Sequence, residues 1–176
     1  FYYFRSDFTI SLDTLETLAN DKCSGALTIA AGDTVDYSTV LASVDPQGYN
    51  CSYARPIGVC YTITGDGQNY EVKTVALQSS LSSVLMVLEG ECSADDFSCM
   101  GSDEAYNLDT AKVQFFAEIG KTFYILAGGD DETSDTGDFR MFLDTIPVWQ
   151  NDRCISAFPL EAGDTIYGST EDALYD

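Results

Sequence analysis

Residues 59–74 read VCYTITGDGQNYEVKT, and their alternation of apolar and polar residues decides the fold class. Successive side chains of a β-strand point to opposite faces, so apolar residues at every second position mark a half-buried strand. The alternating apolar residues are Val59, Tyr61, Ile63, Tyr70 and Val72. Residues 65–67 (Gly-Asp-Gly) between them form a turn signal. The stretch therefore predicts two short strands joined by a turn.

Four further stretches extend this pattern along the chain. Residues 83–89 (SVLMVLE) are apolar on both sides, as expected of a central strand. Residues 112–118 (KVQFFAE) alternate, residues 123–126 follow a Gly-Lys turn, and residues 139–143 alternate again. Short strands separated by Gly, Asp and Asn turns predict an all-β protein, an antiparallel β-sandwich, with almost no helix.

The sequence also contains an internal repeat. A shift of 131 residues aligns residues 7–45 with residues 138–176 without a gap. The matches include Asp7-Phe8 with Asp138-Phe139, Asn20-Asp21-Lys22-Cys23 with Asn151-Asp152-Arg153-Cys154, and Gly32-Asp33-Thr34 with Gly163-Asp164-Thr165. So many identities at one offset predict a tandem repeat with a 131-residue period.

The repeat predicts three parts of the chain. Residues 20–150 would be one complete sandwich, residues 1–19 the closing strand of a preceding unit or its imitation, and residues 151–176 the opening segment of the next. Strands without their neighbours expose edges and apolar faces, so both ends are expected to need a partner. The residues expected to mediate assembly are Phe1, Tyr2, Tyr3, Phe4, Phe8, Ile10 and Leu12.

The charge balance excludes several function classes. The chain has 29 Asp and Glu against 8 Lys and Arg, a formal net charge of -21, and no His. Such a surface repels phosphate, so nucleic acid and anionic membranes are unexpected partners. Without His, no Ser-His-Asp or Cys-His arrangement and no His-bound zinc can form. We therefore expect a protein that is not an enzyme and that requires no cofactor.

Six cysteines indicate the compartment. None forms a CxxC pair, and disulfides in an oxidising, extracellular space explain them better than zinc. Asn50 opens a glycosylation sequon, which agrees with secretion. The chain begins at Phe1 and has no apolar run of transmembrane length, so we expect a removed leader or a piece of a longer protein.

Several motifs together resemble the pre-peptidase C-terminal (PPC-like) β-sandwich domains. The resemblance rests on residues 20–23 (NDKC), 58–65 (GVCYTITG), 85–92 (LMVLEGEC), 120–129 (GKTFYILAGG) and 137–139 (GDF). It implies a jelly-roll-like, non-catalytic accessory module of a secreted protein. Cys60 stands where that family usually has Trp.

The same resemblance implies a disulfide pairing. Cys23 would bond Cys51, and Cys92 would bond Cys99 across a hairpin loop. Cys60 is then left over, and we expect it to be a buried thiol rather than a bond between units. Cys154 would begin the next unit's set.

Acidic loops are candidates for Ca²⁺ binding, because loop oxygens are its preferred ligands. The first group is Asp130, Asp131, Glu132, Asp135 and Asp138, and the second is Asp95, Asp96, Asp103 and Glu104. Neither has EF-hand spacing, so a solvated turn is the favoured interpretation. Residues 135–137 also reproduce the Asp-Thr-Gly of aspartic proteases, but no second such carboxylate is expected nearby.

Three functions follow from these patterns. The leading hypothesis is a structural subunit of an extracellular fibre or surface array, joined end to end by self-association. The second is a carbohydrate- or calcium-dependent adhesion module, with Tyr49 and Tyr53 as a stacking platform for glycans. The third is an accessory domain of a secreted hydrolase whose catalytic part lies outside this chain.

Overall fold

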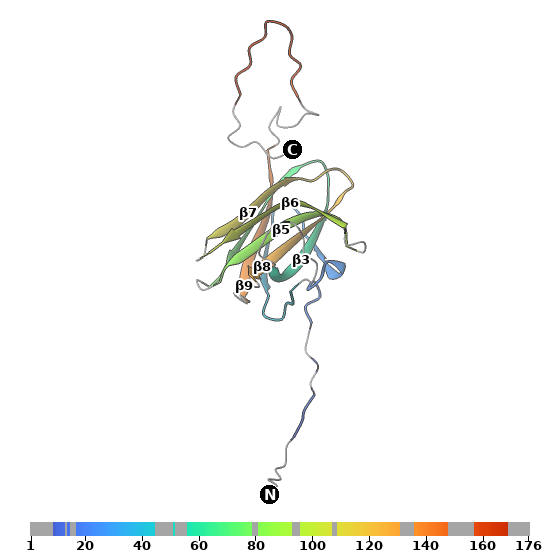
Figure 1. Ribbon diagram of the computed structural model, residues 1–176, viewed down its shortest axis with the longest axis vertical. Helices are drawn as coiled ribbons and strands as arrows, with labels where there is room; N and C mark the ends of the chain where they lie inside the picture. The colour runs from blue at the N-terminus through green and yellow to red at the C-terminus, as the bar shows by residue number, and fades with distance from the viewer. Residues whose placement is uncertain are drawn as a thin grey trace, which may run out of the picture.

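A computed structural model describes residues 9–12, 14, 17–44, 51, 56–78, 81–92, 96–106, 109–130, 136–147 and 157–168 of the chain. Within these residues the chain forms nine strands and one short 3-10 helix (Figure 1). The elements are η1 (Cys23–Gly25), β1 (Leu27–Thr28), β2 (Asp33–Ser38), β3 (Pro56–Thr64), β4 (Asn69–Ala76), β5 (Ser83–Glu91), β6 (Asp96–Ala105), β7 (Thr110–Phe116), β8 (Thr122–Asp130) and β9 (Asp138–Ile146). No helix in this part of the chain has the length and apolar character to cross a membrane.

The strands form two sheets. Sheet A has the order β1-β3-β8-β5-β6, and sheet B has the order β2-β9-β4-β7. The strand pairs are antiparallel except for β1 and β3, which run parallel. The structure therefore confirms the predicted all-β class and is consistent with the predicted β-sandwich, with sheet A mixed rather than purely antiparallel.

The turn signal at residues 65–67 joins the two sheets instead of closing a hairpin within one sheet. It leads from β3 in sheet A to β4 in sheet B, and residues 117–121 lead back from β7 to β8. The two turns bond to each other, because Gly65 donates to Lys121 O at 2.8 Å and Gly120 donates to Gly65 O at 2.9 Å. A Cβ at position 65 would lie 1.9 Å from Glu118 O, so this close approach requires glycine.

The main core lies between the two sheets. Every strand of sheet B except the edge strand β2 contributes buried apolar side chains to it, as do β3, β5, β6 and β8 of sheet A. Its largest fully buried members are Phe123, Leu85, Ile125, Met141, Leu143, Val72 and Val87. Burial of such a side chain stabilises the fold by about 1.5–3 kcal/mol each, so this layer dominates folding.

The outer face of sheet A carries a second apolar cluster. Val84, Met86 and Leu88 of β5 pack there with Cys60 of β3 and Leu126 of β8. The alternate residues of β5, Leu85 and Val87, face the main core. β5 is thus buried on both faces between β8 and β6, which confirms the prediction from its continuous apolar run.

Two disulfides lie at this outer face of sheet A. They pair Cys23 with Cys92 and Cys51 with Cys99. The pairing implied by the PPC-like resemblance, Cys23–Cys51 and Cys92–Cys99, is therefore wrong. Cys99 lies opposite Leu88 at the β5–β6 bulge, where its sulfur bonds to Cys51 rather than to Cys92.

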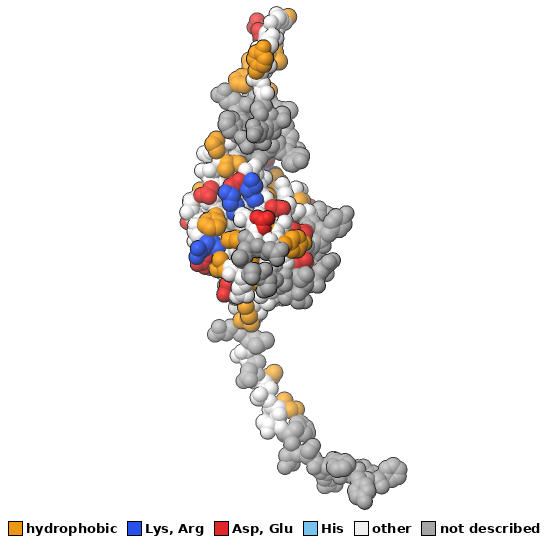
Figure 2. Space-filling model, turned by 90° about the vertical axis from the view of Figure 1, so that its left-hand side faces the viewer, with side chains coloured by type: hydrophobic (Ala, Val, Ile, Leu, Met, Phe, Trp, Pro, Cys, Tyr) orange, Lys and Arg blue, Asp and Glu red, His pale blue; other side chains and the backbone are white. Residues whose placement is uncertain are grey.

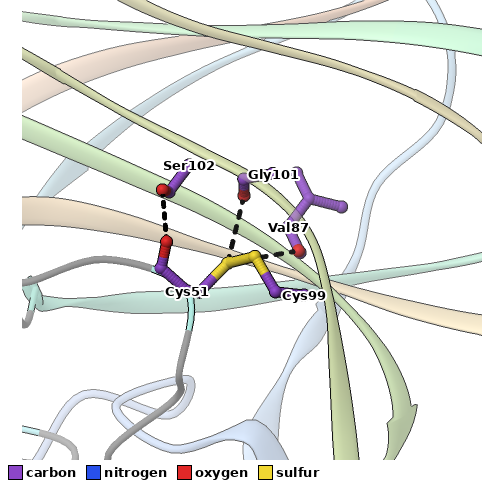
Figure 3. Close-up of a disulfide and its surroundings, with 5 residues drawn as sticks. All are labelled: Cys51, Val87, Cys99, Gly101 and Ser102. Carbon is purple, nitrogen blue, oxygen red and sulfur yellow. Dashed lines mark hydrogen bonds between the residues drawn. A yellow bond between two sulfur atoms is a disulfide. The ribbon is translucent and has the colours of Figure 1, made fainter. Parts of the chain in front are cut away.

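Backbone contacts fix the position of the second disulfide (Figure 3). Ser102 Oγ donates to Cys51 O at 2.7 Å, and the Cys51 sulfur lies 3.4 Å from Gly101 O. The sulfur contact is not a true hydrogen bond, because a disulfide sulfur carries no proton. Cys60 is buried in the apolar cluster on the same face and belongs to neither disulfide, as the sequence predicted.

The repeated Asn-Asp-Lys-Cys motif ties the start of the unit to sheet A. Asn20 Nδ2 donates to Cys60 O at 3.2 Å, and Cys60 N donates to Asn20 O at 2.8 Å. Asp21 accepts from Ser43 N at 2.6 Å, and Lys22 Nζ donates to Val44 O at 3.1 Å. The motif therefore has a structural role within the sandwich.

Removing the second disulfide is expected to destabilise the sandwich. In the chain-entropy model, closure of a loop of this length contributes about 4 kcal/mol, and the variant Cys51→Ser with Cys99→Ser should lose roughly that much free energy of unfolding in urea melts.

Non-reducing peptide mapping of the unmodified protein provides the control. It should yield the Cys23–Cys92 and Cys51–Cys99 peptides. Recovery of Cys23–Cys51 and Cys92–Cys99 would contradict the topology described above.

Candidate assembly interface

Residues 9–12, here called the N-terminal segment, lie outside the sandwich. All four are exposed, and the side chains of Ile10 and Leu12 retain 80% and 97% of their accessible surface. Among the described residues that follow, Leu18 packs against the main cluster and Asn20 bonds to Cys60. The segment thus leaves large apolar side chains in water.

The internal repeat shows which environment these residues match. At the 131-residue offset, Ile10 aligns with Met141 and Leu12 with Leu143. Both counterparts lie on β9 and are 0% exposed in the main core. The N-terminal segment therefore has the apolar pattern of a buried strand and lacks that burial.

Residues 157–168, here called the C-terminal segment, are likewise exposed throughout. Leu160 and Ile166 are 65% and 51% exposed. Their counterparts at the same offset are Ile29, which is buried in the main core, and Val35 of β2, which packs against it. The C-terminal segment therefore also leaves exposed the apolar residues whose counterparts pack in or against the main core.

The C-terminal segment nevertheless has a defined turn. Glu161 N donates to Asp164 Oδ2 at 2.8 Å, Asp164 N donates to Glu161 O at 3.1 Å, and Gly163 has φ 105°. Because an aspartate side chain can bond backbone nearby, such a turn is stable without a sheet around it.

The same turn occurs inside the sandwich between β1 and β2. Ala30 N donates to Asp33 Oδ2 at 2.8 Å, Asp33 N donates to Ala30 O at 3.1 Å, and Gly32 has φ 85°. The aligned positions therefore share a local structure as well as residue types. In the sandwich this turn lies at the edge of both sheets, whereas its C-terminal counterpart pairs with no strand of the described residues.

The two segments project from opposite ends of the sandwich (Figure 1). Figure 2 shows hydrophobic side chains along both projections, away from the body of the molecule. A contact between the two segments of one molecule would have to span the sandwich. Contacts between different molecules would not.

Within the sandwich, the strands that these segments resemble are neighbours. β2 pairs with β9 in antiparallel register, with Val35 opposite Met141 and Asp36 opposite Arg140.

The Tyr37 ring stacks on Phe139 at 5.5 Å, and its hydroxyl lies 2.7 Å from Thr74 Oγ1. Burial raises the pKa of Tyr37, so it stays neutral in the core.

Ion pairing at this edge is specific. Arg140 donates to both carboxylate oxygens of Asp36, at 2.6 and 2.8 Å. These bonds hold the pKa of Asp36 below its ordinary value, and the charge of Arg140 adds to the effect. Such bidentate pairing fixes geometry more than an isolated lysine contact would.

Every Lys and Arg in the described part of the chain is paired with a carboxylate. Lys22, Lys73, Lys112, Lys121 and Arg140 contact Asp21, Glu71, Glu71, Glu89 and Asp36, respectively. Burial alone would raise the pKa of Glu71, but bonds from Lys73 and Gln114 and the charges of both lysines outweigh it and lower the pKa. The remaining acids are a surplus, so two sandwiches repel each other.

The predicted calcium groups lie partly inside the described structure. Asp130, at the end of β8, is buried, whereas Asp138, at the start of β9, is exposed. Asp131, Glu132, Asp135 and Asp95 lie outside the described residues. Among the described residues no group of three or more His, Cys, Asp or Glu is placed to hold a metal ion.

In the second acidic group, Asp103 accepts hydrogen bonds from backbone amides of two strands. Asp103 on β6 accepts from Lys112 N at 2.8 Å and from Glu104 N at 3.0 Å. Its carboxylate oxygens therefore join β6 to β7 rather than point to a common centre with Asp96.

Other predicted site residues lie outside the described part of the chain. These are Phe1, Tyr2, Tyr3, Phe4 and Phe8 of the assembly set, the glycosylation candidate Asn50, the glycan candidates Tyr49 and Tyr53, and Cys154. Sequence reasoning did not select Phe158, Leu160 and Ile166 for assembly. The repeat could have identified them, because they align with Leu27, Ile29 and Val35.

No family model matches the chain, and no match is found among curated proteins. The functional argument therefore depends on the chain's own geometry.

Truncating Met141 should destabilise the isolated chain, whereas truncating the aligned residue Ile10 should have almost no effect. Met141→Ala removes a fully buried side chain, so the free energy of unfolding should fall by about 2–5 kcal/mol. Ile10→Ala should change it by less than about 0.5 kcal/mol in dilute solution, because the side chain is exposed. Urea unfolding by circular dichroism measures both, and an equal loss would mean that the N-terminal segment docks on its own unit.

The Asp36–Arg140 pair should give the sandwich a defined pH response. Because the folded pKa of Asp36 is lowered, its stabilising effect is complete above the unfolded pKa of about 4 and is lost as the pH falls through the folded value. Asp36→Asn should therefore lower the melting temperature at neutral pH, and the difference should shrink in acid. A difference that persists unchanged at low pH would contradict this assignment.

Proposed function

We propose that this chain is a structural subunit of an extracellular fibre or surface array, in which PPC-like sandwich units with a 131-residue period are joined end to end. The observation that carries the proposal is the pair of exposed segments, residues 9–12 and 157–168, whose apolar residues align with core residues of the sandwich. Side chains of this kind are expected to be buried against another unit.

The direction of the two segments supports linkage rather than closure. They project from opposite ends of the sandwich (Figure 1). Contacts between different surfaces of identical subunits produce open chains when the rotation does not close. A chain of units is therefore the simplest assembly that uses both segments.

Charge supports the same arrangement. The net charge is -21, and the described cations are already paired within the sandwich. Repulsion disfavours broad side-by-side contact between sandwiches. Association then depends on the projecting apolar segments, which keep the acidic bodies apart.

The disulfides support an extracellular location. Two disulfides lie at the outer face of sheet A. Disulfide bonds persist in oxidising compartments. An extracellular scaffold that is not an enzyme and requires no cofactor accounts for the same features.

Self-association of the unmodified chain tests this function. Sedimentation velocity over a range of concentrations should detect species larger than the monomer. The variant Leu160→Asp with Ile166→Asp should raise the dissociation constant by at least about tenfold, which corresponds to about 1.4 kcal/mol, because it places two charges where apolar burial is expected.

Ile119→Asp is the matched control. Ile119 is as exposed as these residues but lies in the turn between β7 and β8, so its substitution should leave association unchanged. An unmodified chain that stays monomeric at every concentration, or a control as disruptive as the test variant, would refute the proposed function.

A further inference from the structure

The register of the β2–β9 ladder predicts how the two terminal segments fit each other. In the sandwich, residues 33–36 lie opposite residues 143–140. Residues 33–36 align with residues 164–167, which follow them by 131 positions, and residues 143–140 align with residues 12–9, which precede them by 131 positions. The same register would therefore place residues 164–167 opposite residues 12–9. The resulting pairs are Asp164 with Leu12, Thr165 with Ser11, Ile166 with Ile10, and Tyr167 with Thr9.

We propose that residues 9–12 of one copy pair in antiparallel register with residues 164–167 of a second copy of this chain. This inference rests on the proposed function and specifies its contact. Ile10 and Ile166, exposed in the single chain, then share one face of the ladder, as Met141 and Val35 do in the sandwich. Side chains at directly opposed positions of antiparallel strands are in contact range.

The charged pair of the sandwich shows why the segments suit each other. Asp36 and Arg140 are opposed and ion-paired on β2 and β9. Their counterparts are Tyr167 and Thr9, so both members of the pair are changed together. An aromatic residue opposite a β-branched residue is a favourable cross-strand combination, and both are good strand formers.

Exchange into a neighbour's sandwich fits less well. If residues 164–167 replaced β2, Arg140 would lose its carboxylate partner and face Tyr167. If residues 9–12 replaced β9, Asp36 would face Thr9 without a cation. Gly168 would also stand in place of Tyr37, which would remove the stacking on Phe139 and the hydroxyl contact with Thr74. Each terminal segment is therefore better matched by the other than by the sandwich strand.

The location of the segments decides between pairing within a chain and between chains. They lie at opposite ends of the sandwich (Figure 1). The second copy therefore supplies the partner, and each copy keeps one segment available at each end. The contact is head to tail, so it can repeat from one copy to the next.

A charge-rescue experiment tests the register with full-length chains. Tyr167→Asp places a carboxylate opposite Thr9 and should weaken association by at least about tenfold. Adding Thr9→Arg should restore it, because the pair then reproduces Asp36–Arg140. Adding Thr9→Asp instead should weaken it further, because like charges would be opposed.

Thr14→Arg is the matched control for the rescue. Thr14 is exposed and lies outside the paired residues, so this variant changes the net charge equally. It should not restore association to Tyr167→Asp. Equal rescue by both arginines would mean that overall charge, rather than the proposed register, governs the contact. Circular dichroism of each variant confirms that the sandwich remains folded.

Disulfide trapping gives an independent readout. In a Cys154→Ser background, mixing the Ile10→Cys and Ile166→Cys proteins under mild oxidation should produce a covalent dimer linked through residues 10 and 166. Ser11→Cys with Ile166→Cys should cross-link far less, because adjacent residues of a strand face opposite sides. Mass spectrometry of the peptides identifies the bond.

The outcomes separate the inference from the proposed function. Association without the 10–166 bond would overturn the register and leave end-to-end linkage intact. Cross-linking of Ile10→Cys to Val35→Cys would show that the segment enters a neighbour's sandwich instead. No association at all would refute both proposals.

Discussion

Sheet A is apolar on both faces, and the rest of the structure depends on covering both. Sheet B covers the inner face, as in any sandwich. The outer face, with Met86 and Leu126 at its centre, would be in water without the segments that carry Cys23 and Cys51. Two disulfides, Cys23–Cys92 and Cys51–Cys99, hold these cysteines at that face. The paired cysteines therefore help to keep the outer face of sheet A buried.

Alternation of side chains was sufficient to predict most strands. The spacing of Val59, Tyr61 and Ile63, and of Phe139, Met141 and Leu143, reports burial on one face. The continuous run in β5 reports burial on two. These are local signals, because each residue is tested against its own strand neighbours, and the structure bears them out. The pairing of strands into sheets is not local, and neither the parallel β1–β3 pair nor the crossing of the residue 65–67 turn between sheets could be read from spacing.

Disulfide connectivity shows the same limit. Four cysteines allow three connectivities, and the resemblance implied the two short links. The observed bond between Cys23 and Cys92 spans a sequence separation of 69, because the fold brings η1 to the same apolar cluster as β5. For the candidate interface, the repeat carried more information than aromatic composition did. The repeat aligns the exposed residues Leu160 and Ile166 with Ile29 and Val35 of the sandwich. The aromatic residues at the start of the chain indicated only the N-terminal segment.

The overlap of the two disulfides has a mechanical consequence. Along the sequence the first bond opens at Cys23 before the second opens at Cys51, and it closes at Cys92 before the second closes at Cys99. A pulling force along the backbone would reach the first bond at Cys23, pass to Cys92, and then follow the short stretch to Cys99. The strands between Cys23 and Cys92 cannot be drawn out while the bond is intact. Under load the strands that follow Cys92 are therefore the ones that can lengthen, so the positions of the sulfur bridges also set the extensibility of the sandwich.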